Sequence, residues 1–405
     1  MAKTPRLKWR YSVFTLLFAA VLIGPIWVAV YLVPKGLADR VNLVKVDYAD
    51  LEDWDLDEHG KAVPALRKSC DLLLRRGPRE KVGPSGIGGY VQDWHDPCAA
   101  IESVDERDHN QAKEFFELWF TPFLVSSQGR EEGLFTGYYE PAIQGSLERS
   151  DEFPVPIYGK PPSLISINLG EFDSNLAGEK ISGHLVGEKF KPFATRGEIE
   201  AGALDGRDLE LFWVKDPIAL FFLHIQGSGR VTLPDGRSIR VGYHAQNGHP
   251  YRSIGRELVL RGHLVREDVT MQSIKRWLEE NPEQQSNIFN QNKSFIFFRV
   301  ITGDGPIGAQ NVALTPQRSL AVDLRHMPLG APFWIDTNAP QPTGGDTKLR
   351  RLMVAQDTGG AIRGVVRGDI FWGGDMVAAE IAGRMKHPGR YYILLPLGVV
   401  DEDSR

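Results

Sequence analysis

The 405-residue sequence contains only two cysteines, and this scarcity limits the sites that it can build. Neither Cys70 nor Cys98 stands at the spacing of a metal-binding motif, so the cysteines predict no metal centre. In an oxidising compartment the two could form a disulfide, whereas in a reducing one they would be small buried apolar residues. The sequence leaves both possibilities open.

An excess of positive charge is also missing, because 47 Lys and Arg stand against 52 Asp and Glu. The net charge of −5 argues against a nucleic-acid partner, which would require a basic surface. At 42% hydrophobic and 24% charged residues the composition is that of a globular protein. The 42 glycines and 26 prolines favour short strands and many turns, and the length allows two or three domains.

Long apolar runs are absent except for one near the N-terminus, where no charged residue occurs from Tyr11 to Val33. This run reaches the ~20 residues of a membrane-spanning helix, and residues 1–10 carry basic but no acidic side chains. We therefore expect a single-pass anchor over residues 11–33, with residues 1–10 in the cytoplasm and the rest in the periplasm. A cleaved signal peptide is less favoured, because its apolar core is usually only ~7–15 residues long.

The remaining chain divides by composition and periodicity. Residues 36–60 are acidic and predict a solvated linker, and residues 61–76 and 97–125 have helical periodicity. Residues 144–300 are mostly β in character, with helices expected within 254–280. Strands are expected there at 154–158, 211–214, 218–225 and 230–233, and Pro234-Asp235-Gly236 predicts a hairpin between the last strand and 238–243. Short strands return over 301–397, and 398–405 is a polar tail.

The stretch with the clearest chemistry runs from Leu352 to Gly373. A short apolar segment ends at Asp357, glycine-rich turns follow, and a second short segment carries Asp369. If the two strands are neighbours, both carboxylates lie in one groove, where different environments can keep one protonated and the other ionised. The structural alternative is that each aspartate caps its own turn.

A third aspartate, Asp323, also ends a short strand. The segments AVDLRHMPLG, AQDTGGAIRG and RGDIFWG together resemble the three-aspartate domain of the membrane-bound lytic murein transglycosylase A family. FTGYYEP at 135–141 and NGHPYRSIG at 247–255 are similar to two further signatures of that family, in the same order. The resemblance extends from about Phe135 to Pro396.

This resemblance implies a mainly β fold, in which a double-psi β-barrel catalytic domain receives an inserted second β-rich domain. With the N-terminal transmembrane helix, the expected divisions are 1–35 for the cytoplasmic tip and anchor and 36–60 for the linker. Residues 61–143 and 301–397 would form the barrel domain, 144–300 the insertion and 398–405 the tail.

The family cleaves the β-1,4 bond between N-acetylmuramic acid and N-acetylglucosamine in peptidoglycan and forms a 1,6-anhydro ring. The resemblance assigns the acid/base role to Asp369 and an orienting or polarising role to Asp357, whose charge would help keep Asp369 protonated. Asp323 is expected to support the site, and Arg363 stands where the family typically has lysine. The expected substrate-binding residues are Tyr138, Tyr139, Gln226, Ser228, Tyr251, Arg252, Ser253, Asp323, Thr358, Gly359 and Arg363.

Two other functions remain open on the sequence. One is a peptidoglycan hydrolase in which Asp357 and Asp369 are both catalytic. The other is a non-catalytic glycan-binding protein of the cell wall. In each case the expected partners are peptidoglycan glycan strands and, through residues 11–33, the inner membrane of a Gram-negative bacterium; no metal or organic cofactor is implied and protein partners are unknown.

Overall fold

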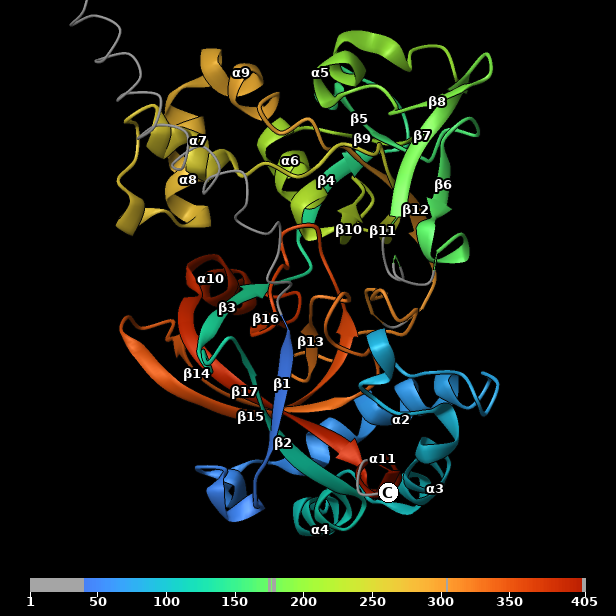
Figure 1. Ribbon diagram of the computed structural model, residues 1–405. Coiled ribbons are helices and arrows are strands. Elements are labelled where there is room, and N and C mark those ends of the chain that lie inside the picture. Colours follow the sequence, from blue (N-terminus) through green and yellow to red (C-terminus); the bar gives the residue numbers. More distant parts are fainter. Residues whose placement is uncertain (1–39, 174–175, 177–179, 304, 403–405) are drawn as a thin grey trace, which may run out of the picture. The chain divides into compact units, whose positions relative to one another are not determined.

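The computed structural model describes residues 40–173, 176, 180–303 and 305–402 (Figure 1). Its largest sheet has eight strands from both ends of the chain. In order across the sheet they are β1 (Val41–Lys45), β2 (Phe120–Ser127), β17 (Lys386–Pro396), β14 (Pro332–Pro340), β15 (Asp346–Asp357), β13 (Ser319–Ala321), β16 (Arg367–Phe371) and β3 (Gly133–Tyr138).

A further pairing between β3 and β17 closes this sheet into a ring, because β3 is hydrogen-bonded to β16 on its other side. Two pairs in the ring, β13 with β15 and β16 with β3, are parallel. Alternate side chains of β14 pack on opposite faces. Phe333 contacts Tyr391, whereas the neighbouring Trp334 contacts Trp54, and all four side chains are buried.

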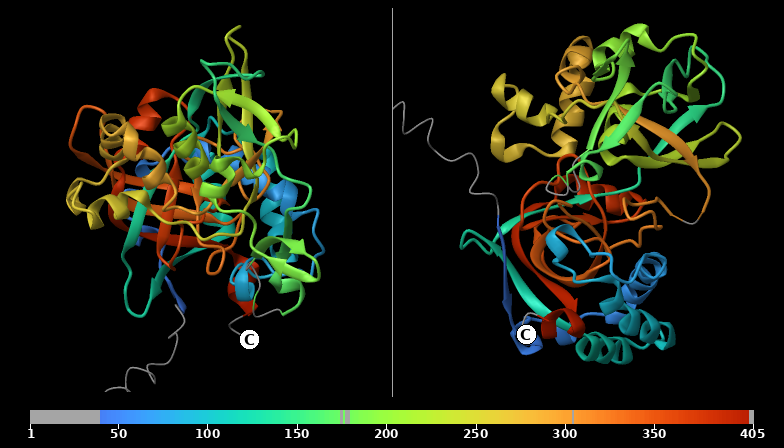
Figure 2. Two further views of the ribbon diagram at one scale, coloured as in Figure 1. Left: turned by 90° about the horizontal axis from the view of Figure 1, so that it is seen from above. Right: turned by 45° about the vertical axis from the view of Figure 1, so that its right-hand side comes forward.

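Residues between β3 and β13 form two separate sheets. In the right-hand view of Figure 2 these strands, which run from green through yellow to the orange β12, lie together in the upper part of the picture. The six-stranded sheet has the order β12 (Ile296–Ile301), β11 (Ser238–Gln246), β10 (Ser228–Thr232), β4 (Ala142–Ser146), β9 (Glu210–Val214), β5 (Val155–Tyr158). The three-stranded sheet consists of β6 (Ile165–Asn168), β7 (Lys180–Val186) and β8 (Lys189–Lys191).

Short helices surround these sheets, and α7, α8 and α9 lie together at one side of the six-stranded sheet (Figure 1). The described helices are α2 (Val63–Leu73), α3 (His95–Ala100), α4 (His109–Trp119), α5 (Arg196–Glu198), α6 (Pro217–Gln226), α7 (Ile254–Leu260), α8 (Met271–Glu280), α9 (Gln285–Phe289), α10 (Met376–Arg384) and α11 (Leu397–Glu402). The predicted hairpin is confirmed, because β10 and β11 pair in antiparallel register.

The strand predicted over 218–225 is wrong, because these residues form helix α6. Asp216 caps the helix by accepting a hydrogen bond from the backbone N–H of Ile218 at 2.8 Å, and Pro217 occupies the first turn, where its missing N–H is harmless. Gly227 ends the helix in the left-handed conformation, with φ of 76°. The segment is apolar on all sides, so its periodicity could not separate a buried strand from a buried helix.

The N-terminal segments also differ from the predictions. The helix expected through residue 125 ends at Trp119, and Phe120 begins strand β2. The acidic stretch predicted as a solvated linker contains strand β1, which pairs with β2, and a buried Trp54. Asp57 in the same stretch is paired with Arg318 at 2.7 Å, and both side chains are buried. Residues 41–60 are therefore packed against the ring.

The transmembrane helix in the predicted fold class is corrected as well. Within the residues that the structure describes, no helix is long and apolar enough to cross a membrane. The longest helices in that part of the chain, α2 and α4, have 11 residues each, whereas a spanning helix needs ~20. Residues 11–33, to which the prediction referred, lie outside the described residues.

The two cysteines form a disulfide between helices α2 and α3. Their Cα atoms are 5.3 Å apart, and Cys70 and Cys98 are 2% and 1% exposed. Of the two states that the sequence left open for these cysteines, the structure has the disulfide. The bridge fixes α2, and this helix contacts strand β15 just before Asp357.

Candidate active site

Asp357 and Asp369 lie on the two strands that flank β13. Ala321 is in register with Asp357 of β15 on one side and with Asp369 of β16 on the other. Two inter-strand spacings of about 4.8 Å place the two aspartate Cα atoms roughly 10 Å apart. A bulge at Gln356 of β15 precedes this pairing, because Leu320 is opposite Ala355 and Ala321 is opposite Asp357. The two strands are not neighbours, as the sequence prediction of a shared groove required, because β13 lies between them; both aspartates are nevertheless opposite the same residue, Ala321.

Asp369 is partly exposed and has a single side-chain donor among the described residues. The hydroxyl of Thr136, which is its register partner on β3, donates to Oδ1 of Asp369. Thr136 in turn accepts a hydrogen bond from Nη2 of Arg367 at 2.8 Å. Burial raises the pKa of Asp369, and the charge of Arg367 and the hydroxyl of Thr136 offset only part of that rise. Burial therefore shifts Asp369 towards its protonated form, and its Oδ2 accepts no hydrogen bond from the described residues.

Asp357 has three hydrogen-bond donors. The hydroxyl of Tyr138 donates to Oδ2 at 2.9 Å, and the backbone N–H groups of Ala309 and Thr358 donate to Oδ1 at 2.8 and 2.9 Å. Burial raises the pKa of Asp357 to about 6, although the three hydrogen bonds act to lower it, and the charge of Asp369 contributes to the rise. Asp357 is thus mostly ionised at neutral pH and is held in one orientation.

The two carboxyl groups accordingly have different environments, as the sequence suggested, although the cause differs from the one expected. Burial is the largest cause of the raised pKa at both positions. Electrostatic repulsion by Asp369 adds to the rise in the pKa of Asp357. A small apolar cluster supports the strands at this point, formed by Tyr138, Leu314, Ala321, Ile362 and Phe371. It excludes water from beneath the carboxylates, and this exclusion explains the raised pKa values.

Asp323 serves a different purpose, because it is fully buried and saturated with donors. Arg325 forms a bidentate pair with it, at 3.0 and 2.6 Å, and the backbone N–H of Gly364 donates to Oδ2 at 2.8 Å. Burial acts to raise the pKa of Asp323, but these donors outweigh it and the pKa falls below its usual value. Asp323 therefore anchors the loop before β16 and is not placed to contact substrate directly.

Three of the predicted substrate residues, Tyr138, Gln226 and Ser228, are buried or occupied by internal contacts. Tyr138 is buried against Phe371, with its hydroxyl on Asp357, so it orients that carboxylate and offers no face for sugar stacking. Gln226 is the last residue of α6, not a strand end, and its Oε1 accepts the backbone N–H of Tyr139 at 3.1 Å. Ser228 is buried in the first position of β10.

Six other predicted residues lie in or near the loop after Asp357. Tyr251, Arg252 and Ser253 line a hollow of about 480 Å³ whose opposite wall is Gly360 and Ala361. Thr358 is tied to the strand end, because its hydroxyl donates to the carbonyl of Val322 at 2.8 Å. In the same loop, the carbonyl of Gly359 accepts from the backbone N–H of Ile362 and from the exposed Arg363, at 3.0 and 3.4 Å. These segments, distant in sequence, meet beside the carboxylates.

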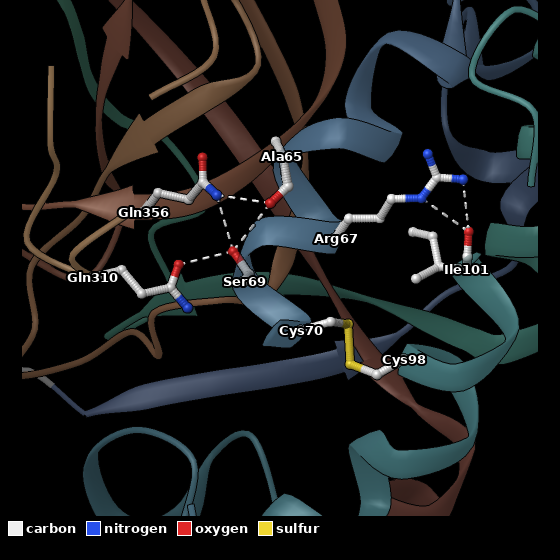
Figure 3. Close-up of a disulfide and its surroundings, with 8 residues drawn as sticks. All are labelled: Ala65, Arg67, Ser69, Cys70, Cys98, Ile101, Gln310 and Gln356. Carbon is white, nitrogen blue, oxygen red and sulfur yellow. Dashed lines mark hydrogen bonds between the residues drawn. A yellow bond between two sulfur atoms is a disulfide. The ribbon is translucent and has the colours of Figure 1, made fainter. Parts of the chain in front are cut away.

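A buried amide network behind the site escaped the sequence analysis (Figure 3). Gln356 is fully buried, and its Nε2 donates to the carbonyl of Ala65 and to Oγ of Ser69 at 2.7 and 2.9 Å. Ser69 also donates to Oε1 of Gln310 at 2.8 Å. Gln356 directly precedes Asp357, and Gln310 directly follows Ala309, whose N–H donates to Asp357. The disulfide-linked helix α2 therefore holds both the strand that contains Asp357 and the loop that supplies one of its donors.

Three further residues of the site were also missed, namely Thr136, Arg367 and Glu140. Glu140 is buried and pairs with Arg240 at 2.5 Å and with Arg230 at 3.5 Å, so it ties β10 and β11 to the chain after β3. Its place in FTGYYEP was the available signal, since a carboxylate directly before proline at a strand end is rarely buried without partners. Thr136 lies in the same motif and Arg367 lies in RGDIFWG, two residues before Asp369 on β16. Only strand pairing, however, brings Thr136 to Asp369.

Two family models match the chain. Residues 134–299 match the model described as the MltA specific insert domain, and residues 318–395 match the 3D domain model. The chain is 35% identical over 265 residues to the membrane-bound lytic murein transglycosylase A of Escherichia coli K12, and 32% identical over 266 residues to that of Vibrio cholerae. Each match covers 64% of this chain and 65% of the relative, so the chain spans just under two thirds of these relatives' length.

Solved structures are similar over more of the chain. The crystal structure of MltA from Neisseria gonorrhoeae is 37% identical, with a TM-score of 0.73 over 88% of this chain and 93% of that one. A membrane-bound lytic murein transglycosylase from Agrobacterium tumefaciens is 34% identical, with a TM-score of 0.78 over 90% of this chain and 100% of that one. The E. coli MltA with bound chitohexaose is 26% identical, with a TM-score of 0.59 over 89% of this chain and 95% of that one.

Proposed function

This chain belongs to the membrane-bound lytic murein transglycosylase A family, and from that premise we propose that it is a peptidoglycan lytic transglycosylase. It cleaves the β-1,4 bond between N-acetylmuramic acid and N-acetylglucosamine and leaves a 1,6-anhydro ring. Asp369 acts as the acid and base, and Asp357 is its ionised partner.

The observation that carries this assignment is the unequal hydrogen bonding of the two aspartates, both of which are partly exposed. Asp357 has donors on both oxygens, which favour its charged form. Asp369 has one hydroxyl donor on Oδ1 among the described residues, so its Oδ2 is the oxygen available to exchange a proton with substrate. A raised pKa at Asp369 suits a general acid, since the proton must be present before the bond breaks.

The reaction requires one proton carrier and no water. Asp369 gives its proton to the glycosidic oxygen as the bond from C1 of the muramic acid sugar breaks. The ionised Asp369 then takes the proton of that sugar's C6 hydroxyl, whose oxygen forms a bond to C1 and closes the anhydro ring. Asp369 ends protonated again, and the negative charge of Asp357 stabilises the positive charge that develops at C1 in between.

The relatives support the choice of substrate and compartment. Related proteins are named murein transglycosylases, and the E. coli structure was solved with a bound chitohexaose, a glycan. We infer that this chain also takes glycan strands of the cell wall and works in the cell envelope, in the periplasm. The Cys70–Cys98 disulfide supports an oxidising location of this kind.

We also propose the predicted domain division, with the barrel domain in 61–143 and 301–397 and the insertion in 144–300. Sheet membership supports it, because β4 to β12 pair only with one another among the described strands. The buried Trp54 and Asp57 indicate that the barrel domain extends back to residue 41.

The proposed function is tested by digesting purified peptidoglycan with the protein and identifying the products by mass. Anhydro-muropeptides are expected. Products that are one water heavier would replace the proposal with the two-carboxylate hydrolase, for which Asp357 beside Asp369 supplies the second group. Binding of glycan with no soluble product would leave a glycan-binding protein.

Thr136→Val removes the one hydroxyl that donates to Asp369 while keeping the side-chain volume. Because this hydroxyl lowers the pKa of Asp369, its loss should raise that pKa further and move the basic limb of the kcat/KM pH profile to higher pH. The ionised base needed in the second half of the reaction is then less stable, so kcat should fall about tenfold at neutral pH, in line with one lost hydrogen bond to a charged group. A Thr121→Val variant, on the outer strand β2, is the control. An unchanged pH profile would remove Thr136 from the proposed proton-transfer site.

A further inference from the structure

The hollow beside the loop after Asp357 carries basic side chains and, among its described lining residues, no acidic one. Tyr251, Arg252, Ser253 and Arg256 form one wall, with Leu260 at the edge. Gly360 and Ala361 form the other, and a Cβ placed on Gly360 would lie 3.6 Å from Cβ of Tyr251. This is an ordinary van der Waals distance, so the backbone at Gly360 lies close to Tyr251 across the hollow.

The positive charge of this hollow is not neutralised by its neighbours. Arg252 pairs with Glu257 at 3.2 Å, but the same carboxylate also pairs with Arg261 at 2.9 Å. Arg256 is exposed, and across the described residues no carboxylate lies within ion-pair distance of it. Arg252 and Arg261 thus share the carboxylate of Glu257, and Arg256 at the hollow has no carboxylate partner among the described residues. The charge lining the hollow is therefore positive, which suits an anionic ligand.

The hollow is also close to the proposed reaction centre. Gly360 is three residues after Asp357, so the two Cα atoms are at most about 11 Å apart even in a fully extended chain. A short stretch of glycan bound over Asp369 would therefore extend to the hollow. The uncharged hydroxyl and acetamido groups of that glycan need hydrogen-bond partners but no net charge.

We propose that Arg252 and Arg256 form a subsite for the carboxylates borne by alternate sugars of the glycan strand, and that this subsite sets a preference for carboxylate-substituted over neutral glycan. The proposal rests on the proposed function for its substrate. The carboxylate is that of the lactyl group itself or that of a peptide attached to it. Guanidinium groups suit either, because their planar array of donors matches a carboxylate.

Binding to the Asp369→Asn protein tests the proposal, since this background leaves the ligands intact during measurement. The ligands are an N-acetylglucosamine hexamer without carboxylates, peptide-free glycan strands with lactyl carboxylates, and strands with peptide stems. Arg256→Ala should weaken the Kd for carboxylate-bearing strands about threefold and Arg252→Ala/Arg256→Ala about tenfold, as expected for partly exposed ion pairs. The effect should shrink as salt is added, and the Kd of the neutral hexamer should not change.

The exposed Arg266, which does not line the hollow, provides the matched control as Arg266→Ala. If the arginine variants bind peptide-free strands more weakly, the subsite binds the lactyl carboxylate. If they bind only the peptide-bearing strands more weakly, it binds a carboxylate of the peptide. An equal loss on all three ligands, or none on any, overturns the subsite. These outcomes are separate from the proposed function, which fails only if the unmodified protein releases no anhydro products from peptidoglycan.

Discussion

Replacing Asp369 with asparagine is expected to lower the rate of anhydro-muropeptide release by about 10²–10⁴-fold, the usual contribution of a general acid–base group. Asparagine has nearly the same shape and can still accept the hydrogen bond of Thr136, so the strand pairing around it should persist. It cannot donate and recover a proton. The measurement is the initial rate of soluble product release from peptidoglycan, with products identified by mass and folding checked by thermal unfolding.

Two further variants define what the result means. Asp151→Asn changes an exposed aspartate of the insertion and should leave the rate unchanged. Asp357→Asn keeps the proposed acid but removes the charge that stabilises C1, so its rate should fall by a smaller factor than that of Asp369→Asn, with anhydro products remaining. Anhydro products at an unreduced rate from Asp369→Asn would move the proton transfer to another group, with Asp357 first to be tested.

Asp57→Asn is expected to reduce the free energy of unfolding by about 3–5 kcal/mol, the range found when one member of a buried ion pair is removed. Asp57 accepts two hydrogen bonds from Arg318, at 2.7 and 2.9 Å, and one from the backbone N–H of Leu352 at 3.0 Å. Without the carboxylate, the guanidinium charge of Arg318 stays buried with only carbonyl partners, Leu352 and Glu58. Urea unfolding at neutral pH measures the difference.

The pH dependence identifies the cause. Burial acts to raise the pKa of Asp57, but the hydrogen bonds and charge of Arg318 lower it below its usual value in the folded protein. Its ionisation therefore contributes stability that is full above the unfolded pKa of about 3.9 and is lost as pH falls through the lower folded pKa. The difference in the free energy of unfolding between wild type and Asp57→Asn should therefore become smaller as the pH falls from the unfolded pKa to the folded pKa of Asp57. Asp55→Asn, at an exposed neighbour, should change stability by less than about 0.5 kcal/mol. A difference that stays constant with pH would contradict the ion-pair explanation.

Local sequence determined much of the site because it depends on short-range rules. Glycines next to Asp357 and a short apolar run before it predict a strand that ends at a carboxylate, and β15 ends at that residue. Likewise Pro234-Asp235-Gly236 predicts the turn of the β10–β11 hairpin. In each case the residues that decide the conformation lie within a few positions of one another.

Only the tertiary structure decided which groups control the two carboxylates. Thr136 reaches Asp369 across 233 positions and Tyr138 reaches Asp357 across 219, through strand pairings that no local pattern encodes. The same is true of Gln356, whose amide partners on α2 come from a helix more than 280 residues earlier. The apolar segment 217–226 became a helix because an N-terminal cap and a left-handed glycine bound it, and six of its ten side chains are buried. The sequence by itself thus placed Asp357 at a strand end, whereas Asp369 lies in the middle of β16. Long-range packing set the burial of both acids and their donors, because desolvation depends on everything that surrounds a group in space.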